Sequence, residues 1–191
     1  MNTLELVLGG ARSGKSRYAE QQMLRLEQQY NRPVMYVATA QCGDGEMSER
    51  IRYHRDSRPQ HWHTREEPIR LADCLQQITA QQPQAVVMVD CLTLWLTNCL
   101  LSEDKECWPQ QKTAFLRCLT QFTQPLVLVS NETGQGVVPM GELSRRFVDE
   151  SGWLHQAIAE LAGQVTLVSA GLPLPLKRNG QPLHQAATLI D

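Results

Sequence analysis

Five short runs of apolar residues recur along the chain, and within each run the hydrophobicity is continuous rather than alternating. They span residues 4–8, 34–38, 85–89, 126–130 and 165–170. Longer stretches with helical periodicity separate them. Continuous hydrophobicity is typical of strands buried on both faces, and strands separated by helices predict a parallel sheet with right-handed crossovers. We therefore expect a three-layer α/β domain with a mostly parallel central sheet.

Length and charge narrow the class of protein. The 191 residues predict a single domain, 1–191, and the 18 basic and 20 acidic side chains give a formal net charge of −2 without a block of like charge. This pattern argues against nucleic acid or an anionic membrane as a partner, and no apolar run approaches the roughly 20 residues that span a bilayer. The amino terminus has no secretory pattern, and the six cysteines lack zinc-ligand spacing. We expect a cytoplasmic protein with a small-molecule partner.

Residues 9–16 read GGARSGKS, which satisfies the phosphate-loop pattern GxxxxGK[ST]. The octet follows the first apolar run and precedes a helix-compatible stretch, 15–27, as the motif requires. Its glycines let backbone N–H groups point at phosphate oxygens, and the helix adds its positive dipole end. We expect Lys15 to reach the β and γ phosphates and Ser16 to bind Mg²⁺. The motif predicts a nucleotide-binding P-loop NTPase-like (RecA-like) fold.

Polar residues follow three of the predicted strands, at 39–41, 90–93 and 131–134. Ligands of parallel sheets bind beyond the carboxyl ends of the strands, so all three segments are expected to face the nucleotide. Asp90 ends its apolar run in the manner of a Walker-B acid and is expected to hold Mg²⁺ opposite Ser16. The alternative is that Asp90 caps a helix beginning near Leu92.

The segment 43–67 is unusually polar and reads GDGEMSERIRYHRDSRPQHWHTREE. A helical core over 46–56 would place Arg50 and His54 one turn apart on the same face. A cation beside an imidazole lowers its pKa and favours the neutral, nucleophilic form, although a structural role for a single histidine stays open. His61 and His63 alternate around Trp62, which favours a short strand over a two-histidine metal site.

Several blocks of the chain together resemble one family. They are GGARSGKSRYAE, YVATAQ, EMSERIRYHRDSRPQHWHTREEP, VDCLTLWLTN and SNETGQGVVP. From residue 4 to about residue 177 the chain resembles the bifunctional adenosylcobinamide kinases and adenosylcobinamide-phosphate guanylyltransferases, which act in the nucleotide-loop steps of cobalamin biosynthesis. It departs from the family at His155, where members often carry Asn. That change is expected to affect a local contact between subunits.

The resemblance implies two reactions. A γ-phosphoryl group passes from ATP or GTP to the hydroxyl of the aminopropanol arm of adenosylcobinamide, with Lys15, Ser16, Asp90 and Mg²⁺ supplying positioning and charge. His54 attacks the α-phosphate of GTP, releases pyrophosphate and forms a GMP-histidine, whose GMP passes to adenosylcobinamide phosphate to give adenosyl-GDP-cobinamide. Arg50, Arg55 and Arg58 would neutralise phosphate charge.

The resemblance also implies a homotrimer and a set of nucleotide contacts. For the contact at Glu66, its neighbour Glu67 is an alternative. With Gly9 and Asp90 included, the set is Gly9, Gly10, Ala11, Arg12, Ser13, Gly14, Lys15, Ser16, Arg17, Thr39, Ala40, Gln41, Ser57, Arg58, Pro59, Gln60, Glu66 and Asp90.

Two rival functions stay open. One is a small-molecule or nucleotide kinase with the same phosphate loop and no covalent intermediate. The other is a non-catalytic module that signals nucleotide state to a partner. The stretch 177–191 is expected to be a turn and a loosely packed tail without function.

Overall fold

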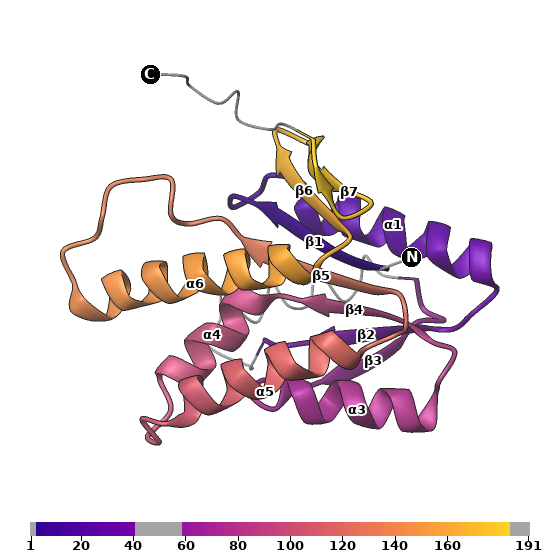
Figure 1. Ribbon diagram of the computed structural model, residues 1–191, viewed down its shortest axis with the longest axis horizontal. Helices are drawn as coiled ribbons and strands as arrows, with labels where there is room; N and C mark the ends of the chain where they lie inside the picture. Colours follow the sequence, from indigo (N-terminus) through magenta and orange to yellow (C-terminus); the bar gives the residue numbers. More distant parts are fainter. Residues whose placement is uncertain (1–2, 41–58, 184–191) are drawn as a thin grey trace.

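The computed structural model describes residues 3–40 and 59–183. Strands and helices alternate along most of this length (Figure 1). In chain order the elements are β1 (Leu4–Gly9), α1 (Lys15–Tyr30), β2 (Val34–Ala38), β3 (His63–Glu66), α3 (Leu71–Gln81), β4 (Val86–Asp90), α4 (Leu92–Leu100), α5 (Cys107–Gln121), β5 (Leu126–Asn131), α6 (Glu142–Leu161), β6 (Gln164–Ser169), β7 (Leu172–Arg178) and β8 (Gln181–Pro182).

The strands of the described residues form one eight-stranded sheet in the order β3-β2-β4-β5-β1-β6-β7-β8. All pairings from β3 through β6 are parallel, whereas β7 runs antiparallel to β6 and β8 antiparallel to β7. The first strand therefore lies inside the sheet, between β5 and β6. The carboxyl ends of β1, β2, β4 and β5 meet at one edge, which is where parallel sheets bind ligands.

Alternate residues of each central strand enter different cores. On β4, Val87 and Val89 belong to a large cluster with α3, α4, α5 and α6, whereas Val86 and Met88 belong to a second cluster with Ala19 and Met23 of α1. Figure 1 shows α1 on one side of the sheet and α3, α4, α5 and α6 opposite. The predicted three-layer arrangement is confirmed.

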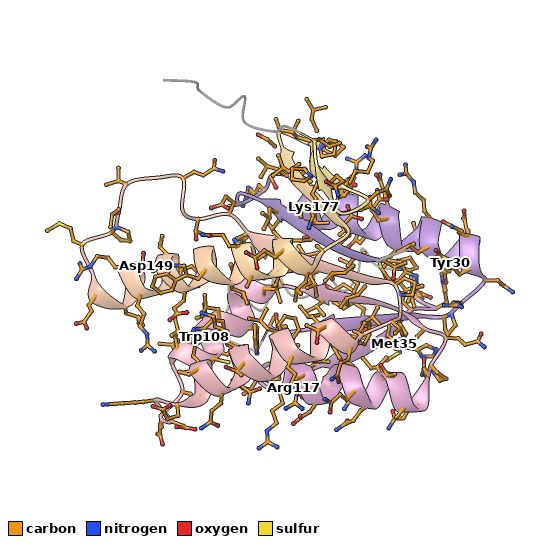
Figure 2. The ribbon with its side chains drawn as sticks, in the orientation of Figure 1. Tyr30, Met35, Trp108, Arg117, Asp149 and Lys177 are labelled. Atoms are coloured by element: carbon orange, nitrogen blue, oxygen red, sulfur yellow. The ribbon has the colours of Figure 1, made fainter. Side chains whose placement is uncertain are left out.

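In the larger core, aromatic side chains join the helices. Trp95 of α4 lies 5.2 Å from Trp108 and 4.9 Å from Phe115, ring centre to ring centre. Lys112 then extends from α5 toward α6, where it forms an ion pair of 2.8 Å with Glu150. Figure 2 shows Trp108 on the part of α5 below Asp149 of α6. These contacts hold α4, α5 and α6 as one layer.

The predicted apolar runs are all strands, with ends within one residue of those expected. The sequence missed the antiparallel strands β7 and β8 at the carboxyl end. The turn expected in this stretch is present at 179–180, but it joins these two strands instead of leading into a loose tail. Proline at 173, 175 and 182 conceals these strands, because proline is depleted from strand interiors. The expected tail beyond residue 183 lies outside the described residues.

The cysteines of the described ranges behave as small apolar residues. Cys74, Cys91, Cys99, Cys107 and Cys118 are all buried, and no disulfide joins any two of them. Burial raises the pKa of Cys74 and of Cys91 to about 11, so neither is a thiolate at neutral pH. None of the helices in these ranges has the length and apolar character needed to cross a membrane.

Candidate active site

The turn between β1 and α1 depends on two glycines. A Cβ on Gly9 would overlap Ser13 Oγ and would lie 2.6 Å from the carbonyl oxygen of Val168. Gly14 has φ of 93°, in the left-handed region, and a Cβ there would lie 3.2 Å from Cα of Gly171. The loop is therefore packed tightly against the turn that joins β6 to β7, and the Gly171 N–H donates to the Ser13 carbonyl at 2.8 Å.

Lys15 begins α1 and reaches back over the loop. Its Nζ donates to the carbonyl oxygen of Gly10 at 3.2 Å. Burial lowers the pKa of Lys15, and the charge of Asp90 opposes that shift. The ammonium therefore lies within electrostatic range of the end of β4. This geometry agrees with the expectation that the phosphate loop and Asp90 lie near each other at one edge of the sheet.

A chain of hydrogen bonds links the polar strand ends. Thr39, after β2, bonds both backbone groups of Cys91, after β4. Cys91 Sγ lies 3.2 Å from Thr93 Oγ1, which accepts from Asn131 Nδ2 at 2.9 Å. Asn131 is paired in register with Gly9 at the start of the phosphate loop. The three polar segments predicted to meet are thus joined side by side from β2 to β1.

Asp90 is oriented by a buried tyrosine. Tyr36 of β2 donates its hydroxyl to Asp90 Oδ2 at 3.0 Å. The residue that caps α4 is Cys91, so the alternative in which Asp90 caps this helix is wrong. One carboxylate oxygen is held by Tyr36 while the group stays at the carboxyl edge of the sheet, as a metal-binding acid would need.

A cavity of about 370 Å³ opens beside the phosphate loop. Its walls come from residues 10–13 of the loop, from Glu132 and Gln135 after β5, and from residues 167–170 at the end of β6. Glu132 was expected to face the nucleotide as part of the segment 131–134, and its position in this wall agrees. The sequence did not predict that residues 169–170 line this cavity, although they come at the end of an apolar run, as the other polar segments do.

His155 of α6 lies behind Glu132. Its Nε2 is 2.7 Å from Ser130 Oγ, and its Nδ1 is 3.9 Å from Glu132 Oε2. The side chain is buried within its own chain, so the expectation that it makes a contact between subunits is wrong. Burial lowers the pKa of His155, an effect that the charge of Glu132 opposes.

Several predicted site residues lie outside the described residues. These are Gln41, Arg50, His54, Arg55, Ser57 and Arg58. Pro59 and Gln60 are described and precede β3, at the amino edge of the sheet rather than the phosphate-loop edge. His61 and Trp62 follow them and bind Glu27 of α1, about 18 Å along that helix from Lys15. Within one chain, Pro59 and Gln60 are therefore apart from the phosphate loop.

The strand predicted around His61 and His63 exists, but it begins at His63, and His61 lies in the preceding turn. Within residues 3–40 and 59–183, no group of three or more His, Cys, Asp or Glu side chains is arranged to hold a metal ion. At the other end of β3, Glu67 Oε1 accepts the N–H groups of Ile69 and Arg70, at 3.0 and 2.7 Å. Glu66 is exposed at the carboxyl end of the strand.

The fold and this edge define the class of protein. A phosphate loop between a central parallel strand and its helix, with an aspartate two strands away, is the arrangement of the P-loop NTPases. Among solved structures, the ATPase domain of a helicase shares the fold, with a TM-score of 0.54 over 95% of this chain and 78% of that domain, at 13% identity. The predicted fold class is therefore confirmed.

The chain belongs to the cobinamide kinase / cobinamide phosphate guanyltransferase family, whose sequence model matches residues 5–176. It is 55% identical to the bifunctional adenosylcobalamin biosynthesis protein CobP of Pseudomonas aeruginosa over 94% of this chain and 99% of that protein. It is 39% identical to CobU of Salmonella typhimurium and 37% identical to CobU of Escherichia coli, in each case over 90% of this chain and 98% of the relative. The family and the enzyme class predicted from the sequence are confirmed.

Proposed function

We propose that this chain phosphorylates adenosylcobinamide with ATP or GTP and then transfers GMP from GTP, through a GMP-histidine on His54, to adenosylcobinamide phosphate. The product is adenosyl-GDP-cobinamide. The observation that supports the kinase half of this proposal is the series of hydrogen bonds from Thr39 to Asn131, because it brings the polar strand ends together around the phosphate loop. Family membership supports the pairing of this kinase with a guanylyltransferase.

In the kinase half, the phosphate loop holds the triphosphate. Backbone N–H groups of residues 10–16 would bind phosphate oxygens, and Lys15 would exchange its bond to the Gly10 carbonyl for the β and γ phosphates. Thr39 and Ala40 follow β2 at the same edge and would contact the nucleotide there. Glu66 is the better candidate of the two neighbouring glutamates, since the Glu67 carboxylate is occupied by backbone N–H groups.

Ser16 and Asp90 would hold Mg²⁺. Hydroxyl and carboxylate oxygens are the donors that this ion prefers, and Asp90 is already oriented by Tyr36. Bound there, the ion would neutralise charge on the phosphoryl group during transfer. Removing it with a chelator is expected to stop phosphoryl transfer.

In the guanylyltransferase half, His54 is the proposed nucleophile and Gln41, Ser57 and Arg58 are proposed nucleotide contacts. Pro59 and Gln60 lie at the opposite edge of the sheet from the phosphate loop. For these two residues to contact a nucleotide on the loop, a neighbouring subunit must supply them or the segment must move. A homotrimer, in which neighbouring copies complete one another's sites, accommodates this requirement.

The surface offers a region for such assembly. The loop between β5 and α6 extends away from the sheet (Figure 1), and Val137 and Met140 on it are 97% and 96% exposed. Leu143 and Trp153 of α6 are exposed as well. The exposed apolar side chains of this short loop are a candidate interface between proteins. Val137→Asp with Met140→Lys is expected to convert a trimer to monomers in analytical ultracentrifugation.

We also propose that the enzyme works in the cytoplasm. The five buried cysteines form no disulfide among themselves, as is usual for proteins of a reducing compartment. Both nucleotide substrates are available there.

The test of the covalent step is labelling with GTP carrying a radioactive α-phosphate. We expect an acid-labile, alkali-stable label on the protein that is absent from His54→Ala and retained by His63→Ala, a matched change at an exposed histidine of β3. Adding adenosylcobinamide phosphate should transfer the label to the corrinoid. A lack of protein-bound label in the presence of Mg²⁺ would contradict the proposal and favour a kinase without a covalent intermediate.

The test of the kinase step is transfer of a labelled γ-phosphate from ATP or GTP to adenosylcobinamide. Nucleotide binding without transfer, measured with Mg²⁺ present, would instead support the non-catalytic module.

A further inference from the structure

Glu132 is the acidic residue in the wall of the cavity beside the phosphate loop. It follows Asn131 at the end of β5, and its N–H donates to the carbonyl oxygen of Gly9 at 3.0 Å. This bond continues the pairing of β5 with β1 by one residue. The carboxylate therefore starts from a backbone position fixed to the first glycine of the loop.

The Glu132 side chain is also held at its far end. Oε1 accepts the N–H of Gly134 at 2.7 Å, and Oε2 faces His155 Nδ1 at 3.9 Å. The imidazole itself is fixed by the 2.7 Å contact between its Nε2 and Ser130 Oγ, both of which are buried. Glu132 is thus bonded to β1 through its N–H and to its own loop through Oε1, with His155 of α6 beside Oε2, so its carboxylate is preorganised. With a side chain that is 22% exposed, it still presents a face to the cavity.

A carboxylate beside a polyphosphate site needs a chemical reason, because like charges repel. Asp90 has one, as a candidate Mg²⁺ ligand, and it lies on β4 with Tyr36 on its other oxygen. Glu132 lies on the adjacent strand, β5, against residues 10–13 of the loop. A carboxylate in that position is favoured when a hydrogen-bond donor lies between it and the phosphate. In a kinase reaction, the substrate hydroxyl that receives the phosphoryl group is such a donor.

We propose that Glu132 is a catalytic residue of the kinase step, which accepts the proton of the corrinoid hydroxyl, and that His155 is a positioning residue for it. This inference rests on the proposed function. In the step, the hydroxyl oxygen forms a bond to the γ-phosphorus, and the bond from that phosphorus to the β–γ bridging oxygen breaks. The nucleoside diphosphate leaves with the electron pair, and the hydroxyl proton passes to Glu132 and then to water.

The first test replaces Glu132 with Gln, whose carbonyl oxygen can still accept the Gly134 N–H. The kcat for phosphorylation of adenosylcobinamide is expected to fall about 10²- to 10⁴-fold, the usual contribution of a general base. The KM for ATP and the GMP labelling of the protein are expected to stay at wild-type values. Glu160→Gln, an exposed change on α6, is the matched control and should leave both activities unchanged.

The second test separates His155 from a purely structural role. His155→Gln keeps a group at the position of Nε2 for Ser130 and removes the imidazole edge that faces Glu132. The kcat of the kinase is expected to fall several-fold, while the KM for nucleotide and the GMP labelling are retained. In the Glu132→Gln background the same change should have no further effect on kcat, because the two residues act through one group.

Other outcomes overturn the inference. If Glu132→Gln retains the kinase kcat, Glu132 is excluded as the proton acceptor. A higher Mg²⁺ requirement in that variant identifies a metal ligand, and a higher KM for GTP but not for ATP identifies a nucleobase contact. Parallel loss of GMP labelling indicates a structural role. If the unsubstituted protein transfers no phosphate to adenosylcobinamide, the proposed function fails and the inference falls with it.

Discussion

The Thr39 hydroxyl and the Cys91 peptide form a closed pair of hydrogen bonds. Thr39 Oγ1 accepts the Cys91 N–H at 2.9 Å and donates to the Cys91 carbonyl oxygen at 2.7 Å. Thr39 is fully buried, and its own carbonyl oxygen accepts from Asn98 Nδ2 at 2.9 Å. The Thr39 side chain therefore fixes the ends of β2 and β4 relative to each other, and its main-chain carbonyl links them to α4.

Thr39→Val should remove this link while keeping the shape of the side chain. The Cys91 N–H and carbonyl groups lose their buried partner, so the free energy of unfolding is expected to fall by about 1–3 kcal/mol. Urea unfolding followed by circular dichroism measures the change. Thr39→Ser keeps the hydroxyl and should retain most of the stability, and equal losses in the two variants would contradict the role of the hydrogen bonds.

The two leading glycines of the phosphate loop should tolerate alanine differently. Gly9→Ala forces a Cβ against Ser13 Oγ and the Val168 carbonyl, whereas a Cβ on Gly10 meets no atom within 4 Å. In the absence of nucleotide, Gly9→Ala is expected to lower the free energy of unfolding by about 1–3 kcal/mol. Gly10→Ala should change it by less than about 0.5 kcal/mol. Similar thermal unfolding of the two variants would show that the loop is not packed in this way.

Lys15→Ala should affect both reactions. The ammonium is the charged group that the loop brings toward the phosphates, and its loss is expected to lower the kinase kcat by about 10²- to 10³-fold. Guanylylation should fall as well if GTP binds with its phosphates on the same loop. Transfer of γ-labelled and α-labelled phosphate, with the exposed Lys105→Ala as control, separates the outcomes. Loss of one activity alone would demonstrate two nucleotide sites.

The buried His155 should make stability depend on pH. Its pKa is lowered from the usual 6.5 in the folded protein, so below pH 6.5 the unfolded chain takes up a proton that the native imidazole does not. The free energy of unfolding is therefore expected to decrease as the pH falls from 6.5 toward the folded pKa. This decrease should be smaller in His155→Gln, and identical slopes in the two proteins would contradict a neutral, buried imidazole.

The five strands formed by the apolar runs could be predicted because most of their residues are buried. Runs such as 85–89 contain nothing but apolar residues, and the phosphate loop located the first helix. The hairpin of β7 and β8 could not be predicted in the same way. Its strands are half-exposed and contain prolines, and Lys177 of β7 is held by the carbonyl oxygens of Ala159 and Glu160 at the end of α6, an interaction that depends on the finished fold.

For the site, the sequence located the strand ends but not the contacts between them. Thr39, Asp90 and Glu132 each follow an apolar run, and a topological rule alone brings them to one edge. The bond between His155 and Ser130 joins residues 25 positions apart, and His155 belongs to no motif that would predict it. The amino-edge position of Pro59 and Gln60 was equally hidden, since it depends on the direction and register of β3 beside β2.

The prolines of the carboxyl-terminal hairpin have a consequence for how molecules of this protein meet. Pro173 and Pro175 on β7 and Pro182 on β8 lack the N–H group through which another strand would be added. At the other end of the sheet, β3 is only four residues long and carries Arg65 and Glu66. Both borders therefore resist intermolecular strand addition, the usual route to β-aggregation. Copies of the chain are therefore expected to associate through contacts between side chains. Such contacts can break and form again without extending the sheet.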